Sequence, residues 1–301
     1  MANAHRTVVR KAERVGDDLK RLFDRLGNTD HPRGDILAAY RLALASMPQA
    51  LTNYTAAREI ATRLRADVRR GVVGVFGDAS ELGIEQGRAE ASEWDLDSIS
   101  LGILPIVNDA AEVVLGAVGQ QLNTVLAEIR TGSPDAAELF GDESRYGILA
   151  PAGVVLAAAR WITTITDTAH NTYTEQAIER SGQTKDQYGL QAIAAIDDKT
   201  TDCCLKVHGQ IIPVKGEFHL TGTPRFADNM KAPPFHWNCR TATALVKLDE
   251  QDDDLTRILK AAAQTEIEAR RDGVQDVPTR TNAGSVRPSR AGRLRQVVRG
   301  G

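Results

Sequence analysis

The chain has 301 residues, enough for one large domain or two ordinary ones with a sizeable core. Its 42% hydrophobic and 26% charged residues are typical of a soluble globular protein. The formal charge of −3 excludes a protein that coats nucleic acid along its whole length. The longest uncharged apolar run is too short to span a bilayer and contains Pro151, so we expect no membrane contact.

Apolar residues recur at steps of three and four along most of the first 180 residues, a spacing that predicts amphipathic helices. The predicted helices cover 8–27, 32–48, 51–71, 105–132 and 152–181. The segment 78–93 has a weaker pattern, because Gly83 and Gly87 interrupt it. Such periodicity indicates which side of each helix is buried, so these residues are interpreted as the core of a helical bundle.

The pattern changes near residue 190. Short apolar runs, "QYGLQAIAAIDDKTTDCC" and "HGQIIPVKG", are bounded by Asp, Thr, Gly and Pro and predict strands and turns. An irregular stretch at 221–234 follows, and "TATALVKL" then resumes strand-like alternation. A module of roughly sixty residues is only marginally stable with a core alone, so a cross-link would help to stabilise it.

An acidic run, "DEQDDD", follows Leu248, and the apolar residues after it predict one amphipathic surface helix. The segment 276–301 holds six arginines against one aspartate, with two prolines and four glycines, so we expect a mobile tail. Such a basic arm could neutralise phosphates or bind an acidic protein surface. A merely solvated tail is equally compatible with this composition.

These patterns predict a mainly α protein in four segments. A helical body covers 1–185 and a small, loop-rich α+β module covers 186–248. An acidic linker and helix at 249–275 and a flexible basic tail at 276–301 complete the chain.

All three cysteines and three of the six histidines lie between residues 203 and 239. Cys204 and His208 form a C-x3-H pair, while His236 and Cys239 form an H-x2-C pair. Zinc binds four such ligands in a tetrahedron, and two short-range pairs can supply them. The candidate metal ligands are therefore Cys204, His208, His236 and Cys239.

Two further residues are possible substitutes. Cys203 could replace Cys204, but both cannot easily bind one ion if adjacent side chains point apart in an extended strand. His219 lies in the loop between the two pairs. A small core with buried, metal-free thiols is the main alternative to a metal site.

An enzymatic site is a weaker interpretation of the cluster. A nucleophilic cysteine needs a base within reach, which His236 could provide for Cys204, but no glycine-rich oxyanion turn accompanies it. A zinc hydrolase needs a general-base glutamate beside a ligand, and Glu217, between the two pairs, adjoins no suitable histidine.

Taken together, "AIAAIDDKTTDCCLKVHGQIIPV" and "APPFHWNCRTATALV" resemble the signature of the phage Mu protein F-like head morphogenesis family, the minor head proteins of tailed phages. The matching residues are Asp197 or Asp198, Thr200, Cys204, His208, Gly209 and the run 233–240. The resemblance covers about 155–247, including the long helix before the motif. Two departures concern the ligands: Thr241 stands where the family often has a second cysteine, and Cys203 is an additional thiol.

The resemblance implies a structural minor head (minor capsid) protein that acts in head morphogenesis near the portal vertex, without enzymatic activity. The implied partners are the portal protein and the major capsid protein, with packaged DNA as a further contact through the basic tail. The implied location is the virion, after assembly in the host cytoplasm. We expect one structural zinc as cofactor. The alternative function is a metal-dependent hydrolase or nuclease delivered with the phage genome.

Overall fold

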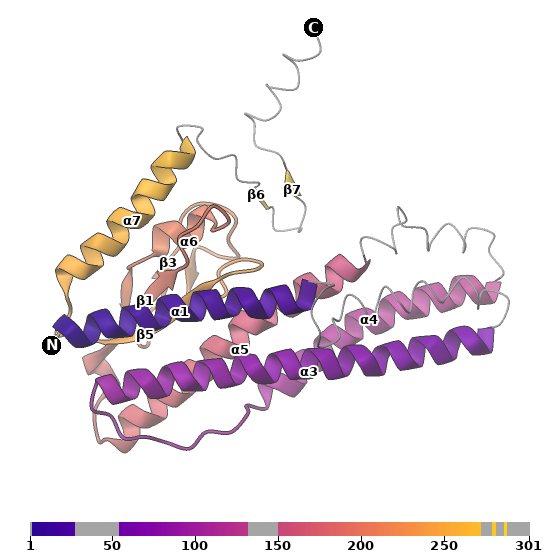
Figure 1. Ribbon diagram of the computed structural model, residues 1–301, viewed down its shortest axis with the longest axis horizontal. Helices are drawn as coiled ribbons and strands as arrows, with labels where there is room; N and C mark the ends of the chain where they lie inside the picture. The colour runs from indigo at the N-terminus through magenta and orange to yellow at the C-terminus, as the bar shows by residue number, and fades with distance from the viewer. Residues whose placement is uncertain (1, 28–53, 132–149, 272–278, 281–285, 288–301) are drawn as a thin grey trace, which may run out of the picture. The chain divides into compact units, whose positions relative to one another are not determined.

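The computed structural model describes residues 2–27, 54–131, 150–271, 279–280 and 286–287. Long helices dominate it, and a small sheet-containing module follows them in the chain (Figure 1). This confirms a mainly α fold with a helical body and a small α+β module. The helices are α1 (Ala2–Gly27), α3 (Tyr54–Glu93), α4 (Ile106–Thr131), α5 (Ala150–Arg180), α6 (Asp202–Val207) and α7 (Asp253–Arg271), with a 3-10 turn, η4, at Lys185–Gln187.

Three of the predicted long helices, 8–27, 105–132 and 152–181, are confirmed by α1, α4 and α5. The stripe of α1 that includes Val8, Ala12 and Leu19 is buried, as its spacing indicates. The helix predicted at 32–48 and most of the tail at 276–301 lie outside the described residues. None of the described helices combines the length and the apolar character needed to cross a membrane.

The prediction of a helix end at Gly71 and a broken segment at 78–93 is wrong, because α3 continues to Glu93. Gly83 and Gly87 lie where the helix meets α5 at close range. A Cβ atom on Gly83 would lie 2.1 Å from the Thr166 carbonyl oxygen, and one on Gly87 would lie 2.9 Å from the Tyr173 Cβ. The two glycines cost helix propensity, about 1 kcal/mol each, but they allow the two backbones to touch.

A three-stranded antiparallel sheet with the order β2-β1-β5 forms the centre of the small module. Leu190 of β1 pairs with Leu245 of β5, and Ala192 pairs with Thr243. All seven residues of β1 are buried, so both faces of this strand are covered. The strands are β1 (Tyr188–Ala194), β2 (Ile211–Pro213), β3 (Phe218–His219), β4 (Asn229–Met230), β5 (Thr241–Lys247), β6 (Thr279–Arg280) and β7 (Val286–Arg287).

The stretch "TDCCLKV" is helical, whereas its sequence predicts a strand end and a turn. It forms α6, which begins after Thr201, an extended residue at the N-cap position. Thr201 makes no capping bond with its side chain, but the negative charge of Asp202 in the first turn suits the positive end of the helix dipole. Gly209, with a φ of +76°, turns the chain away after the helix.

The amphipathic helix predicted after the acidic run is confirmed as α7. One side of it, Leu259, Ala263 and Ile267, is buried, and the last two residues pack against Leu205 of α6. The helix is therefore docked on the small module through its apolar face.

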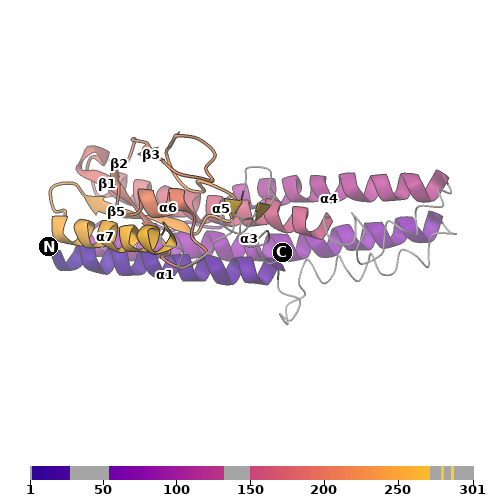
Figure 2. The same cartoon turned by 90° about the horizontal axis from the view of Figure 1, so that it is seen from above.

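Contacts divide the chain into two compact units. One comprises 1–20, 81–102 and 166–301, and the other comprises 21–80 and 103–165. This division differs from the sequential segments expected at 1–185 and 186–248, whose separate folding stays a prediction. In the first unit, His5 of α1 joins Gln191 of β1 (Nε2 to Oε1, 2.8 Å) and accepts a hydrogen bond from the Asp252 amide. Both views place the start of α7 beside this end of α1 (Figures 1 and 2).

Side chains of α3 cover the free edge of β5. Gln86 Nε2 donates to the Thr243 carbonyl (2.7 Å), Trp94 Nε1 donates to the Leu245 carbonyl (2.8 Å), and Glu90 accepts from the Leu245 amide (2.9 Å). The three residues are spaced four apart, with Gln86 and Glu90 on one face of α3 and Trp94 directly after its last residue. They satisfy backbone groups that an edge strand would otherwise leave unpaired.

Glu90 also belongs to a closed and largely buried ring of hydrogen bonds, which we call the Glu90 network. His170 Nε2 lies 2.6 Å from Glu90 Oε2, and both side chains are almost completely buried. His170 Nδ1 lies 3.1 Å from Asn171 Oδ1, and the Asn171 amide donates to Asp167. The members, in order around the ring, are Gln86, Glu90, His170, Asn171, Asp167 and Thr243.

Candidate metal centre

Three thiols and one imidazole gather between α6 and the turn that follows Pro234. Cys204 Sγ lies 3.0 Å from His236 Nε2 and 3.7 Å from Cys239 Sγ. The ligand atoms of Cys203, Cys204 and His236 all lie within 4.8 Å of one another. These side chains are buried, with exposed fractions of 0% for Cys203 and Cys239, 1% for Cys204 and 5% for His236. Cys203, Cys204 and His236 could together hold a metal ion, and Cys239 lies beside Cys204.

The helical conformation of α6 brings both adjacent cysteines to the cluster. The sequence predicts that only one of Cys203 and Cys204 can face a common ion if the stretch is an extended strand. The stretch is helical, so this premise is wrong. Neighbouring side chains of a helix diverge by about 100° rather than 180°. Cys203 and Cys204 can therefore approach the same point, which they do to within 4.8 Å.

The second half of the site depends on a tight turn. Asn238 has a φ of 57°, in the left-handed region that Asn tolerates better than most residues. This residue turns the chain between His236 and Cys239, and both of these side chains reach Cys204.

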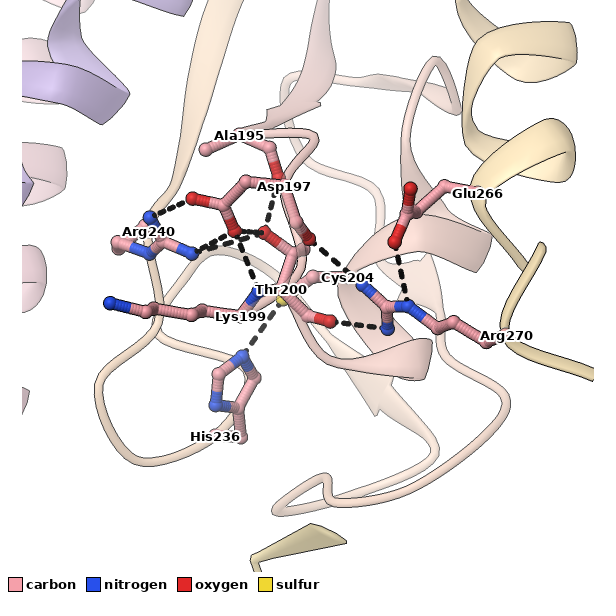
Figure 3. Close-up of polar contacts among 9 residues, drawn as sticks. All are labelled: Ala195, Asp197, Lys199, Thr200, Cys204, His236, Arg240, Glu266 and Arg270. Atoms are coloured by element: carbon pink, nitrogen blue, oxygen red, sulfur yellow. Dashed lines mark hydrogen bonds and ion pairs between the residues drawn. The ribbon is translucent and has the colours of Figure 1, made fainter. Parts of the chain in front are cut away.

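His236 points its Nε2 atom toward the cluster. Its Nδ1 lies 2.6 Å from the Trp237 carbonyl oxygen, which can only accept, so Nδ1 carries the proton. Nε2 lies nearest Cys204 and can bind a metal when it carries no proton (Figure 3). Metal-binding histidines commonly donate their other ring N–H in this way.

His208 is held in the opposite tautomer. Its Nδ1 accepts a hydrogen bond from the Ala194 amide at 2.9 Å, so the proton of the neutral ring is on Nε2. Nε2 is buried and has no hydrogen-bond partner among the residues the structure describes. Burial lowers the pKa of His208 to about 4, which keeps the ring neutral near pH 7.

The structure thus brings together three of the four predicted ligands, Cys204, His236 and Cys239. His208 instead bonds to β1. His219, the spare candidate, is exposed, and its Nδ1 lies 3.1 Å from Asn229 Oδ1.

The electrostatics of the thiols favour one thiolate beside one thiol. Burial, reinforced by the neighbouring sulfur atoms, raises the pKa of Cys204 well above its usual range. Burial also acts to raise the pKa of Cys239, but the hydrogen bond from Cys204 and the charge of His236 outweigh it and hold this pKa well below the usual range. Thiolate sulfur and imidazole nitrogen are ligands that zinc prefers.

An ion pair braces the two halves of the site (Figure 3). Arg240, directly after Cys239, donates two parallel hydrogen bonds to Asp197, with N–O distances of 2.7 and 2.5 Å. Thr200 accepts a further bond from Arg240 and contacts the Ala195 carbonyl. Burial acts to raise the pKa of Asp197, but Arg240 outweighs it and lowers this pKa to about 2.

A second arginine attaches α7 to the same loop. Arg270 donates to the carbonyl oxygens of Thr200 (2.6 Å) and Asp197 (2.8 Å), and its Nε donates to Glu266 (2.9 Å). Sequence reasoning missed this residue, because Arg270 stands far from the motif and nothing near it marks a partner. The Glu90 network was missed for the same reason, since its members come from α3, α5 and β5.

No family model, no curated protein and no solved structure matches this chain.

Proposed function

We propose that this chain is a structural minor head protein of a tailed phage, acting in head morphogenesis near the portal vertex through protein–protein contacts. The observation that supports the proposal is the meeting of the two halves of the Mu F-like signature. Asp197 and Thr200 bond to Arg240 across some forty residues of chain. Cys204 likewise contacts His236 and Cys239. The signature residues therefore contact one another, as expected of a motif whose role is to stabilise the fold.

The burial of the cluster favours a structural role over catalysis. A catalytic zinc site keeps an open coordination position and a base beside it. Here the sulfur and imidazole groups are buried together, and Asp197, the carboxylate bonded to Arg240, is fully engaged by its partners. A metal-dependent hydrolase or nuclease remains the second function, and an activity assay separates the two.

We further propose one structural zinc in this cluster. The sheet is small, with strands of three to seven residues, and the chain between β2 and β5 is largely irregular. A metal bound by deprotonated ligands adds folding free energy that such a module lacks. The donor set of sulfur and imidazole selects zinc over magnesium or calcium, which prefer oxygen ligands.

The proposed partners follow from the same role. The portal protein and the major capsid protein would bind the helical body, and the six arginines of 276–301 would contact packaged DNA. The proposed location is the virion, with assembly in the host cytoplasm.

The test is the composition of particles made by the phage or prophage that encodes the chain. Quantitative mass spectrometry of purified heads should find the chain at a fixed copy number per head, cross-linked to the portal protein. Deleting its gene should reduce the yield of normal heads while leaving portal and capsid synthesis intact. Absence of the chain from heads, or a nuclease activity of the purified protein that a chelator abolishes, would contradict the proposal.

A further inference from the structure

We propose that the metal ion is bound by three thiolates and one imidazole, from Cys203, Cys204, Cys239 and His236, and that His208 is not a ligand. This inference rests on the metal site proposed above and is independent of the role in the phage head. It replaces the C-x3-H pair expected from the spacing with a pair of adjacent cysteines on α6.

The separation of two of the sulfur atoms already matches that of a tetrahedral site. With zinc–sulfur bonds of about 2.3 Å, two sulfur ligands at the tetrahedral angle lie about 3.8 Å apart. Cys204 Sγ and Cys239 Sγ lie 3.7 Å apart. A hydrogen bond between the two thiols holds them at this distance in the absence of an ion, so binding of zinc requires no change in their separation.

His236 supplies the nitrogen ligand. For a zinc–nitrogen bond of about 2.0 Å, a sulfur and a nitrogen ligand lie roughly 3.5 Å apart. Nε2 of His236 lies 3.0 Å from Cys204 Sγ, so the ion requires this contact to open by about half an ångström. The Trp237 carbonyl fixes the ring with its Nε2 lone pair toward the sulfur.

Cys203 completes the set. Its sulfur lies within 4.8 Å of both Cys204 Sγ and His236 Nε2. At present the thiol donates a hydrogen bond of 2.7 Å to the Pro224 carbonyl. Binding the ion replaces this S–H bond with a sulfur–metal bond, and the thiol proton leaves to solvent.

His208 is excluded by its hydrogen bond. A histidine binds a metal through an unprotonated nitrogen. The Ala194 amide donates to Nδ1, which occupies that lone pair, and the proton of the neutral ring therefore blocks Nε2. Freeing Nε2 for a metal would move the proton to Nδ1, where it would face the Ala194 N–H, and one buried donor of β1 would lose its acceptor.

The charge of the site is also compatible with three thiolates. Three thiolates around a divalent ion leave one net negative charge. Arg240 is the adjacent cation, close enough that charge on Cys204 and Cys239 acts on it. The guanidinium can therefore balance the excess charge while it holds Asp197.

The test compares Cys203→Ser with His208→Asn in the full-length chain. Asn is the matched control, because its side-chain oxygen can accept the Ala194 hydrogen bond in place of Nδ1. In the cobalt-substituted protein, the near-ultraviolet sulfur-to-metal absorption grows with the number of thiolates. Cys203→Ser should lower this absorption by about one third and weaken zinc binding by more than ~100-fold, because loss of an outer contact alone costs about 10- to 100-fold. His208→Asn should leave the spectrum and the one-to-one stoichiometry unchanged.

X-ray absorption of the unsubstituted zinc protein counts the ligands without any variant, should Cys203→Ser fail to fold. Three sulfur and one nitrogen neighbour support the proposal. Two sulfur and two nitrogen neighbours, or an unchanged cobalt spectrum in Cys203→Ser, would overturn it. A chain without any metal would refute both the ligand set and the zinc site, whereas absence from phage heads would refute only the function.

Discussion

Two buried polar clusters of this protein differ in one respect. In the Glu90 network each member bonds to the next and the ring closes, so the protein satisfies the cluster by itself. In the Cys/His cluster of Cys203, Cys204, His236 and Cys239, three thiols and one imidazole contact one another and nearby backbone carbonyls. The members of both clusters have hydrogen-bond partners, so the difference lies in the chemistry of the groups: sulfur and imidazole are ligands that zinc prefers, and this donor set is what supports our proposal of an ion in the second cluster.

The two clusters therefore have different tasks. The Glu90 network fastens α3 and α5 to the edge of β5 and needs no ligand. The Cys/His cluster joins α6 to the turn before β5, and under our proposal its strength depends on an ion. Variants of the two sites should consequently differ in whether added metal changes their stability.

The largest effect is expected for Cys239→Ser. This change removes one ligand, and structural zinc in small domains is worth of order 10 kcal/mol. We expect the zinc to be lost and the amide exchange of 188–247 to rise strongly, with α4 unaffected. Hydrogen exchange with mass spectrometry measures both regions at once. His219→Asn is the control, because His219 is exposed, and it should change stability by less than about 0.5 kcal/mol.

Glu90→Gln should have the next largest effect on stability. The change keeps the shape of the side chain but leaves His170 without its carboxylate partner, and breaking a buried ion pair on one side costs about 3–5 kcal/mol. Denaturant unfolding with and without zinc measures the loss, which should be the same in both conditions. The exposed pair Arg69–Glu112 offers a control, since Glu112→Gln should cost less than about 1 kcal/mol.

Asp167 should make stability depend on pH in a specific direction. Burial raises the pKa of Asp167 to about 6 from 3.8 in the unfolded chain. The folded state then retains a proton that the unfolded state releases, so this contribution is lost as the pH rises from about 4 to about 6. Asp167→Asn removes the dependence, and the stability difference between the natural chain and this variant should fall by up to about 3 kcal/mol between pH 4 and pH 7.

His170 should also make the protein less stable as the pH rises, in the same direction as Asp167. Burial acts to lower the pKa of His170, but the charge and hydrogen bond of Glu90 outweigh it and the pKa is raised. Its contribution is complete below the unfolded pKa of 6.5 and is lost as the pH rises through the folded value. In Asp167→Asn, part of the dependence of stability on pH should persist. If that part disappears in the double variant Asp167→Asn/His170→Gln, it belongs to His170. A stability that rises with pH across this window in the difference curve would contradict the assignment.

Gly83→Ala should cost about 1–3 kcal/mol, the usual range for overpacking. The added Cβ meets the Thr166 carbonyl oxygen, a backbone atom, at 2.1 Å, so α3 and α5 must separate and strain the Glu90 network. Gly74→Ala is the matched control on the same helix, because nothing lies within 4 Å of the added atom. It should stabilise the protein by about 0.5–1 kcal/mol. Equal effects at both positions, seen by thermal unfolding, would show that the contact with α5 is unimportant.

The sequence predicts those parts of the fold that depend on local pattern. The buried stripes of α1, α4 and α5 repeat at helical spacing and are identifiable without knowledge of any partner. The continuity of α3 is not, because Gly83 and Gly87 act as helix breakers unless α5 is known to lie against them. The register of β1 with β5 joins residues about fifty positions apart and leaves no local signal.

For the candidate site, too, the sequence predicts what depends on local spacing but not what depends on distant partners. The spacing of Cys204, His236 and Cys239 predicted a cluster, since few residue types gather in this way by chance. The sequence favours Cys204 over Cys203 only if this stretch is an extended strand, whereas Thr201 and Asp202 begin a helix. His208 fits the spacing of a ligand, but the Ala194 amide, fourteen residues away, determines which of its nitrogens is free.

The central claim, that the chain holds one structural metal ion in its Cys/His cluster, is tested most directly by native mass spectrometry of the purified full-length protein. We predict a mass greater than that of the bare chain by one zinc ion, which is lost together with the fold of 188–247 when the protein is denatured. A folded chain at the bare mass, with all three thiols reduced and the module protected from hydrogen exchange, would contradict the claim.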